Sequence, residues 1–129
     1  MIITDTLSNF FSKIKNGYLA KRNKTTQYKS KQIIKILNIL IKEGLIKSYT
    51  FCKKNPNIIN IYYKYNNNNK IICQIIRISK PSKRIYIKNK DLFKIKKKGL
   101  YILSTSYGII TDLEAKKLNL GGELICNIY

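Results

Sequence analysis

The segment SKQIIKILNILIKEGLI, residues 30–46, has the pattern of a helix that packs against a sheet. Ser30 is placed to cap this helix, and Gly44 supplies the left-handed residue that ends it. The apolar positions recur at helical spacing and form a wide stripe: Ile33, Ile34, Ile36, Leu37, Ile39, Leu40 and Ile41. Because so wide a stripe leaves little of the helix polar, we expect a neighbouring sheet to cover it.

Upstream of residue 30, the sequence predicts one further helix and one strand. Thr4 is placed to cap the helix, and Asn16-Gly17 is expected to mark its end. An apolar stripe at helical spacing supports this helix: Leu7, Phe10, Phe11, Ile14 and Tyr18. A basic segment follows, with a short strand expected at residues 25–28.

Downstream, two strands are predicted at residues 46–53 and 58–65, around an Asn55-Pro56-Asn57 turn. The N-terminal part therefore has the order helix, strand, helix, strand, strand. Residues 66–69 are a polar run of low complexity, which is typical of a linker. We expect two small domains, an N-terminal one at residues 1–65 and a C-terminal one at residues 70–129.

The C-terminal domain is predicted to be mostly β, with one short helix. Extended segments are expected at residues 71–79 and 84–87, separated by a Lys80-Pro81-Ser82 turn. Residues 94–98 hold four lysines, as either a solvated basic loop or a contact to phosphate. The remaining elements are, in order, a strand at 101–103, a hydroxyl-rich loop at 104–108, a strand at 109–110, a helix from Thr111 or Asp112 to 118, and a strand at 123–129. The predicted fold class is α/β (α+β).

The chain is strongly basic. Lysine and arginine number 26 against 6 acids, for a formal net charge of +20, and histidine is absent. A compact chain with such an excess repels itself unless an anionic partner neutralises it. We expect nucleic acid rather than an anionic membrane or an acidic protein, because the basic residues run through the whole chain. Residues 33–46, the longest mainly apolar stretch, are too short to span a bilayer.

The three cysteines, Cys52, Cys73 and Cys126, are scattered and odd in number. They lack the paired spacing of a zinc site, and the chain has no histidine to complete one. We interpret them as reduced and mostly buried apolar side chains, which fits a reducing compartment. No metal and no cofactor are expected.

Four residue types with AT-rich codons dominate the composition: Ile (25), Lys (23), Asn (14) and Tyr (10). This bias indicates an organelle genome or the genome of an extremely AT-rich bacterium. We expect a mitochondrial protein, with a relict plastid or the cytoplasm of an AT-rich bacterium as alternatives. Part of the lysine excess then reflects codon bias, so the value of +20 overstates the functional charge.

The motif Ser104-Thr105-Ser106 is better suited to recognition than to catalysis. A serine nucleophile needs a base, usually histidine, and the motif is not a strand-to-helix serine elbow. Short hydroxyl side chains donate and accept hydrogen bonds, and they let backbone approach a sugar, a phosphate or a base edge. A plain turn is the alternative. We therefore predict no catalytic residues and no enzyme activity.

The motif Gly121-Gly122-Glu123 and two tyrosines are further candidates. The glycines make either a tight turn or a close contact to a rigid ligand. Glu123 either forms an internal salt bridge or accepts a hydrogen bond from a base amino group or a ribose hydroxyl. Tyr86 and Tyr107 are candidate stacking surfaces for unpaired bases.

Motifs along nearly the whole chain occur in the order of a known family: Ile14-Lys15-Asn16-Gly17, Ser30-Lys31, Lys42-Glu43-Gly44-Leu45-Ile46, Arg77-Ile78-Ser79-Lys80-Pro81, Arg84-Ile85-Tyr86, Ser104-Thr105-Ser106-Tyr107-Gly108-Ile109-Ile110-Thr111-Asp112 and Gly121-Gly122-Glu123-Leu124-Ile125-Cys126. In these motifs the sequence closely resembles bacterial-type small ribosomal subunit protein eight. The resemblance implies two small α/β domains and a structural, non-catalytic role. That role is to bind and stabilise a helix in the central domain of small-subunit ribosomal RNA, which supports assembly and translation.

The resemblance also implies which residues contact RNA. In the C-terminal domain these are Ser104, Thr105, Ser106, Tyr86, Gly121, Gly122 and Glu123, and in the N-terminal domain Thr4, Asn16 and Lys31. The implied partners are small-subunit ribosomal RNA and the neighbouring small-subunit proteins two, five and seventeen, with no membrane partner and no small-molecule substrate. This chain departs from the family pattern at three places, because family members usually carry a methionine where Ile110 stands, a basic residue near the position of Tyr107, and a glycine where Ser82 stands.

Three other functions remain as alternatives. A repressor of messenger RNA that imitates the ribosomal site would use the same surface. A basic DNA-binding or architectural protein would explain the charge alone. An enzyme acting on nucleic acid is disfavoured, because the sequence lacks histidine and has no clustered carboxylate or cysteine metal site.

Overall fold

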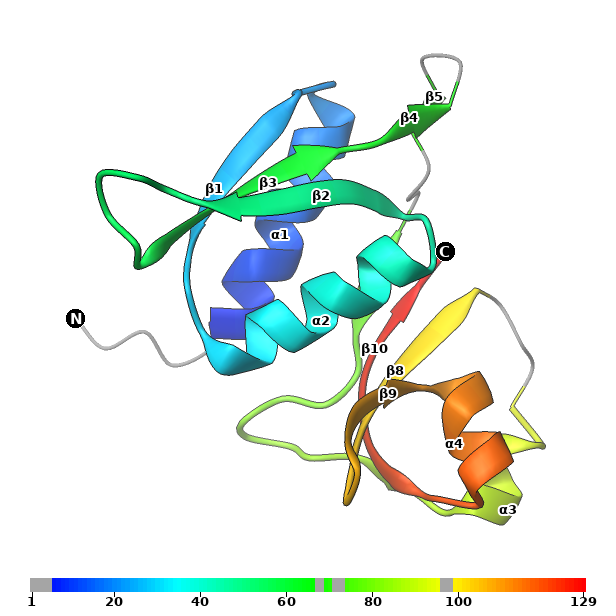
Figure 1. Ribbon diagram of the computed structural model, residues 1–129. Helices are drawn as coiled ribbons and strands as arrows, with labels where there is room; N and C mark the ends of the chain where they lie inside the picture. Colours follow the sequence, from blue (N-terminus) through cyan, green and yellow to red (C-terminus); the bar gives the residue numbers. More distant parts are fainter. Residues whose placement is uncertain (1–5, 67–68, 71–73, 96–98) are drawn as a thin grey trace. The chain divides into compact units, whose positions relative to one another are not determined.

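The computed structural model describes residues 6–66, 69–70, 74–95 and 99–129 (Figure 1). The chain divides into two compact units, Thr6–Cys73 and Gln74–Tyr129. Each unit combines helices with antiparallel strands, which confirms the predicted α+β fold class. Thr4, the predicted cap of the first helix, lies outside the described residues.

The first unit is built on a three-stranded antiparallel sheet in the order β1-β3-β2 (Figure 1). The strands are β1 (Lys24–Tyr28), β2 (Ile46–Phe51) and β3 (Ile58–Tyr63). β1 begins one residue before its predicted start, whereas β2 and β3 each end two residues before their predicted ends. Burial alternates along β3, where Ile59, Ile61 and Tyr63 are buried. Helices α1 (Thr6–Leu19) and α2 (Lys31–Lys42) cover this face of the sheet. Two hydrogen bonds show this: the Tyr63 hydroxyl donates one to α1, and the hydroxyl of Tyr49, which pairs with Ile61, donates one to α2.

Helix α2 forms as its sequence predicts. The Ser30 hydroxyl accepts a hydrogen bond from the Ile33 backbone N–H (3.1 Å), which satisfies a free donor of the first turn. Gly44 adopts φ +76°, and the N–H of Leu45 donates to the carbonyl of Leu40 (2.8 Å) to close the C-terminal end. The buried side chains are Ile33, Ile36, Leu37 and Leu40. Both predicted ends are therefore confirmed.

Helix α1 does not end at Asn16-Gly17, as the sequence suggested, but continues to Leu19. A Cβ atom at Gly17 would lie 1.9 Å from the hydroxyl oxygen of Tyr63, whose O–H donates to the carbonyl of Lys13 (3.1 Å). Gly17 is thus needed for close packing inside the helix and not for its termination. The left-handed residue that follows the helix is Lys21, at φ 54°.

Three tyrosines form a cluster beside α1. The ring of Tyr18 lies edge-on to Tyr63, with 4.7 Å between centroids, and 5.5 Å from the ring of Tyr65. The Tyr18 hydroxyl donates to the carbonyl of Leu45 (2.5 Å). Burial raises the pKa of Tyr18 to about 12, and it also raises the pKa of Tyr63 and of Tyr65. These hydroxyls are therefore neutral donors near neutral pH.

Strands β4 (Tyr65–Asn66) and β5 (Asn69–Lys70) pair as a short antiparallel hairpin after β3. The predicted boundary at residues 66–69 falls within this hairpin, whereas the two compact units divide at Cys73 and Gln74.

The second unit contains a sheet in the order β6-β10-β8-β9, with β7 also paired to β10. The strands are β6 (Ile75–Arg77), β7 (Tyr86–Ile87), β8 (Leu100–Thr105), β9 (Gly108–Thr111) and β10 (Gly122–Ile128). The strand predicted at 71–79 is shorter than expected, and its residues 71–73 lie outside the described part. The predicted turn is confirmed, because Lys80 and Lys83 exchange backbone hydrogen bonds across it (2.9 and 3.0 Å).

Two helices pack on one face of this sheet, where a single short helix was expected. They are α3 (Asn89–Leu92), which the sequence did not predict, and α4 (Asp112–Leu118). Thr111 caps α4, accepting from the Glu114 N–H (3.3 Å), and Asn119 at φ 56° ends it. Leu92 and Ala115 from the helices form a core with Leu103 and Leu124 from the sheet.

Candidate RNA-binding surface

A row of three predicted site residues crosses the sheet of the second unit. Glu123 of β10 lies opposite Tyr86 of β7 on one side and Ser104 of β8 on the other. Residues directly opposite each other in antiparallel strands project to the same face. Three segments that are far apart in the sequence therefore present their side chains together. We refer to Tyr86, Glu123 and Ser104 as the cross-strand row.

The cross-strand row lies on the face of the sheet away from α3 and α4. Leu103 and Leu124, the neighbours of Ser104 and Glu123 along their strands, are paired with each other and belong to the core beneath the helices. Since successive side chains of a strand alternate between faces, Ser104 and Glu123 project from the opposite side. Tyr86 is 71% exposed there.

The two glycines allow β10 to lie close to its neighbours. A Cβ atom at Gly122 would lie 2.2 Å from the carbonyl oxygen of Ser104, and one at Gly121 would lie 2.5 Å from that of Ile87. The preceding turn is held by Asn89, whose side-chain amide donates to the carbonyls of Ala115 (3.2 Å) and Leu120 (3.1 Å). The observed role of this pair is close approach between strands of the same chain, which neither predicted alternative, a tight turn or contact with a rigid ligand, described.

Glu123 forms the internal salt bridge that was one of its two predicted roles. Its carboxylate lies 3.1 Å from Nη1 of Arg84 and accepts a hydrogen bond from the Ser79 hydroxyl (2.9 Å). The Ser79 hydroxyl in turn accepts from the Ile85 N–H (3.2 Å), which ties the segment before β7 to β10. The side chain of Glu123 is only 14% exposed, whereas that of Arg84 is 57% exposed. The pair therefore holds a positive charge at the surface beside the cross-strand row.

The predicted site did not include Ser79 and Arg84. The signal available for them was their position in the motifs Arg77-Ile78-Ser79-Lys80-Pro81 and Arg84-Ile85-Tyr86. Nothing local in those motifs indicates that both side chains reach Glu123, which is 44 and 39 residues away in sequence.

The hydroxyl-rich segment is a strand end and a turn, not a loop of five residues. Ser104 and Thr105 belong to β8, and Gly108 already begins β9. The Thr105 hydroxyl is used within the turn, where it donates to the carbonyl of Gly108 (2.9 Å) and accepts from the N–H of Tyr107 (3.2 Å). Ser106 and Tyr107 form the exposed tip, and Tyr107 is 74% exposed.

Two other predicted contacts lie in the first unit. Asn16 is exposed on α1, and Lys31 is exposed as the first residue of α2. Both are accessible on the surface of their own unit.

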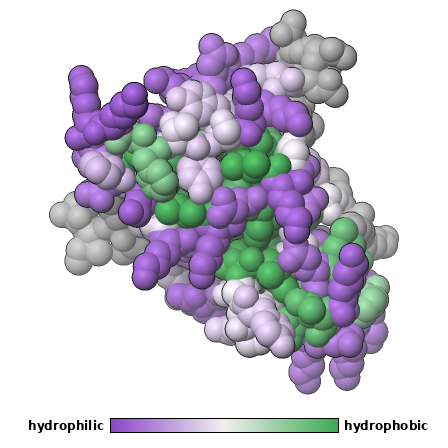
Figure 2. All heavy atoms as spheres, in the orientation of Figure 1, coloured by the Kyte–Doolittle hydropathy of each residue, from purple (hydrophilic) through white to green (hydrophobic). Residues whose placement is uncertain are grey.

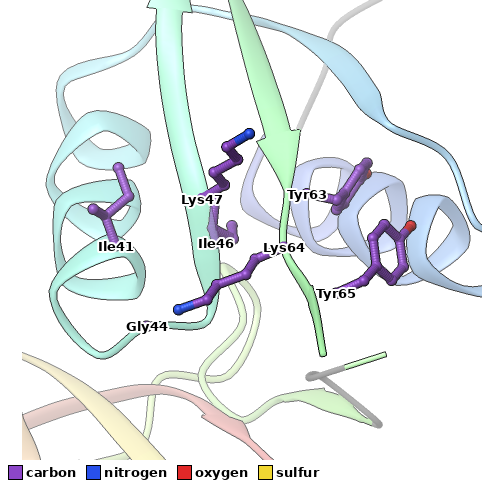
Figure 3. A pocket seen from close by; sticks show the side chains of 7 residues that line it. All are labelled: Ile41, Gly44, Ile46, Lys47, Tyr63, Lys64 and Tyr65. Carbon is purple, nitrogen blue, oxygen red and sulfur yellow. The ribbon is translucent and has the colours of Figure 1, made fainter. Parts of the chain in front are cut away.

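The first unit also has a pocket of about 500 Å³ next to the tyrosine cluster (Figure 3). Gly44, Lys47 and Lys64 line it together with Tyr63 and Tyr65, whose rings lie on the side of α1 in Figure 3. None of the lining residues is acidic. The pocket therefore offers cationic and aromatic side chains but no carboxylate that could act as a base.

No group of three or more potential metal ligands occurs among the described residues. Within the same part of the chain, no helix is long and apolar enough to cross a membrane. Cys126 is buried, which raises the pKa of its thiol to about 12 and keeps it protonated near neutral pH. Cys52 is a free thiol of intermediate exposure, and Cys73 falls outside the described residues.

A family model described as ribosomal protein S8 matches residues 5–129. The chain belongs to the ribosomal protein S8 family. Similar proteins include the small ribosomal subunit protein uS8 of Rickettsia massiliae (strain Mtu5), which is 42% identical, and those of Ehrlichia chaffeensis and Rickettsia bellii (strain OSU 85-389), each 41% identical. Each alignment covers 100% of this chain and 100% of its relative. S8 proteins are structural proteins of the small ribosomal subunit and not enzymes, which confirms the predictions of family and of a non-catalytic role.

Proposed function

We propose that this protein binds a helix in the central domain of small-subunit ribosomal RNA through the cross-strand row and the tip of the β8–β9 turn. The observation that carries this proposal is the pairing of Glu123 with both Tyr86 and Ser104, which gathers three implied RNA contacts on one face of a rigid sheet. Binding to one folded RNA element would stabilise it for later steps of subunit assembly.

The side chains of this surface make different kinds of contact with RNA. Arg84, held by Glu123, is available to bind a phosphate or a base edge through its planar guanidinium. Tyr86 and Tyr107 offer exposed rings on which an unpaired base can stack. The hydroxyls of Ser104 and Ser106 are short enough to reach ribose hydroxyls and base edges. Glu123 acts as a positioning residue for Arg84.

Electrostatics supports RNA as the partner of this surface. Residues 74–129 contain twelve lysine and arginine residues against four acids, so the unit attracts a polyanion. On the face drawn in Figure 2, hydrophilic residues occur in both units. Charge therefore supplies attraction without sequence preference, and the cross-strand row supplies the preference.

Contacts from Thr4, Asn16 and Lys31, which the family resemblance implies for the N-terminal domain, belong to the same proposal as additional RNA contacts. The proposed protein neighbours are small-subunit proteins two, five and seventeen. The AT-rich codon bias supports a mitochondrial ribosome as the place of assembly. A relict plastid and an AT-rich bacterium are the alternatives, and the relatives named above are bacterial.

Photocrosslinking from position 106 tests the proposal. A photoreactive amino acid would replace Ser106 in one variant and Phe93, which is 62% exposed beside α3, in a matched control. In assembled small subunits, position 106 should crosslink to one helix of the central domain of the RNA, and position 93 should not crosslink to that helix. Equal crosslinking of both positions to that helix, or no RNA crosslink from position 106, would overturn the proposal.

A further inference from the structure

The first unit is more basic than the contacts implied for it require. Residues 6–73 contain fourteen lysine and arginine residues and a single acid, Glu43. Most of the implied RNA contacts lie in the second unit instead. Such an excess of charge is unfavourable in a folded unit unless a polyanion lies against it. The question is therefore which surface of the first unit that polyanion contacts.

The outer face of the three-stranded sheet is the surface that fits. Helices α1 and α2 cover the face that carries Ile59, Ile61 and Tyr63. The strand register places nine side chains on the opposite face, in three rows across β1, β3 and β2: Lys24, Tyr62 and Ser48; Thr26, Asn60 and Thr50; and Tyr28, Ile58 and Cys52. In the last row, the Cys52 N–H donates to the carbonyl of Ile58 (2.9 Å), which continues the register by one residue.

These nine side chains combine aromatic rings with hydrogen-bonding groups. Tyr28 and Tyr62 stand at opposite ends of the face, and Tyr28 is 67% exposed. Between them lies a row of two hydroxyls and one amide, from Thr26, Thr50 and Asn60. None of the nine residues is acidic.

The outer face carries positive charge at Lys24, which lies in one row with Tyr62 and Ser48. Nζ of Lys29, the residue after Tyr28, lies 5.6 Å from the centroid of the Phe51 ring. Because Phe51 pairs with Ile59, this second cation lies at the edge of the sheet on the helix-covered side. A phosphate backbone passing over the outer face would therefore meet Lys24 beside Tyr62.

We propose that the outer face of this sheet binds unpaired nucleotides of RNA. Bases stack on Tyr28 and Tyr62, while the polar row of Thr26, Asn60 and Thr50 bonds to base edges and ribose hydroxyls. Base stacking on aromatic side chains of a sheet requires bases that are not already stacked in a duplex, so the ligand is single-stranded or looped. An acidic protein segment would form ion pairs with lysine, but it would not supply bases to stack on the exposed tyrosine rings or ribose hydroxyls to bond to the polar row. The proposal concerns a surface other than the cross-strand row and does not depend on it.

Fluorescence anisotropy with labelled decauridylate tests this binding on the full chain. Tyr28→Ala and Tyr62→Ala should each weaken binding by about fivefold or more, whereas Tyr28→Phe should bind like the wild-type protein because the ring is retained. Phe93→Ala is the matched control: it removes an exposed ring of the second unit that belongs to neither proposed surface, so it should leave decauridylate binding unchanged. Tyr86→Ala should weaken binding of the structured central-domain helix. The two families of variants separate a failure of this proposal from a failure of the proposed function.

Cys52 supplies an independent readout, since its thiol is free and lies on the same face. Saturating decauridylate should slow alkylation of Cys52 by N-ethylmaleimide, and an RNA duplex of equal length should not. Tyr28→Ala remains decisive if Tyr62→Ala proves unstable, because Tyr28 is mostly exposed. Unchanged decauridylate affinity of Tyr28→Ala, together with unprotected Cys52, would overturn the proposal. Crosslinks from position 28 to a neighbouring protein alone in assembled subunits would also overturn it and assign the face to that protein.

Discussion

Arg84 and Glu123 form an ion pair in which the two partners differ in exposure. Nη1 of Arg84 lies 3.1 Å from Oε2 of Glu123, and the arginine side chain is 57% exposed against 14% for the glutamate. A carboxylate in a protein that binds RNA would repel phosphate if it stood free. Paired in this way, it holds an arginine at the surface in one orientation. Glu123 therefore affects RNA binding through Arg84.

Glu123→Gln should reduce the specificity of RNA binding. Glutamine keeps an acceptor for the Ser79 hydroxyl but removes the charge that orients Arg84. We expect the preference for the central-domain helix over a random RNA duplex to fall by roughly two- to fivefold, in line with the energy of an exposed ion pair. Filter binding with both RNAs measures this ratio.

The matched control is Glu114→Gln, which removes the same charge from α4 of the same unit. With about five phosphates neutralised, the plot of log K against log salt should have a slope of roughly −4, and neither variant should change it by more than about one. An equal loss of specificity in both variants would show that net charge, and not the position of Arg84, matters.

Thr105→Ala and Ser106→Ala should separate the structure of the turn from its contact with RNA. The Thr105 hydroxyl makes two hydrogen bonds inside the turn, so its loss should lower the free energy of unfolding by about 1 kcal/mol. Ser106 is exposed, and its alanine variant should unfold like the wild-type protein but bind the central-domain helix more weakly. Urea denaturation and RNA titration of both variants measure the two effects. A stability loss confined to Ser106→Ala would contradict this assignment.

Gly17→Ala should destabilise the protein, although alanine favours helices. In an open helix the substitution adds up to about 1 kcal/mol of stability. Here the new Cβ would lie 1.9 Å from the Tyr63 hydroxyl oxygen and 2.3 Å from its ring, so the ring must move. We expect a loss of about 1–3 kcal/mol, as for overpacked cores. The control is Asn16→Ala at the exposed neighbouring position, which should raise stability by a few tenths of a kcal/mol, roughly the difference in helix propensity. Thermal unfolding by circular dichroism distinguishes the signs.

The stability of the first unit should fall in alkaline solution partly because of Tyr18. Burial raises its pKa from 10.0 to about 12, so the folded state favours the protonated hydroxyl. The contribution is fully present below pH 10 and is lost as the pH rises through about 12. In Tyr18→Phe the free energy of unfolding should therefore decrease less between pH 10 and 12 than in the wild-type protein.

Lysine deprotonation affects both proteins in the Tyr18 experiment and cancels in the comparison. Some pH dependence should persist in Tyr18→Phe, because burial also raises the pKa of Tyr63 and Tyr65. Below pH 9 the variant should be less stable by about 1 kcal/mol, the value of its lost hydrogen bond to the carbonyl of Leu45. Parallel pH curves for the two proteins would show that the Tyr18 hydroxyl is not buried as described.

The sequence alone determined the elements whose cause is local. Helix α2 begins at the Ser30 cap and ends at Gly44 as predicted, because caps and left-handed residues act within one turn of the helix. The basic composition and the hydroxyl and glycine motifs indicated RNA and identified Ser104, Glu123 and Tyr86 as candidates. Spacing along the chain contains all of this information.

Only the tertiary structure decided how those candidates meet. The sequence around Gly17 has the pattern of a helix end, but in the structure Gly17 packs against Tyr63, which is distant in sequence. Ser104 and Thr105 looked like loop residues, but pairing with β9 and β10 makes them part of a strand. The sequence likewise does not indicate which residue pairs with Glu123. In the structure, β10 pairs with β7, and this pairing places Nη1 of Arg84 3.1 Å from the Glu123 carboxylate. Strand pairing and close packing depend on residues that are distant in sequence. A local sequence pattern therefore does not determine which of these distant residues will make contact.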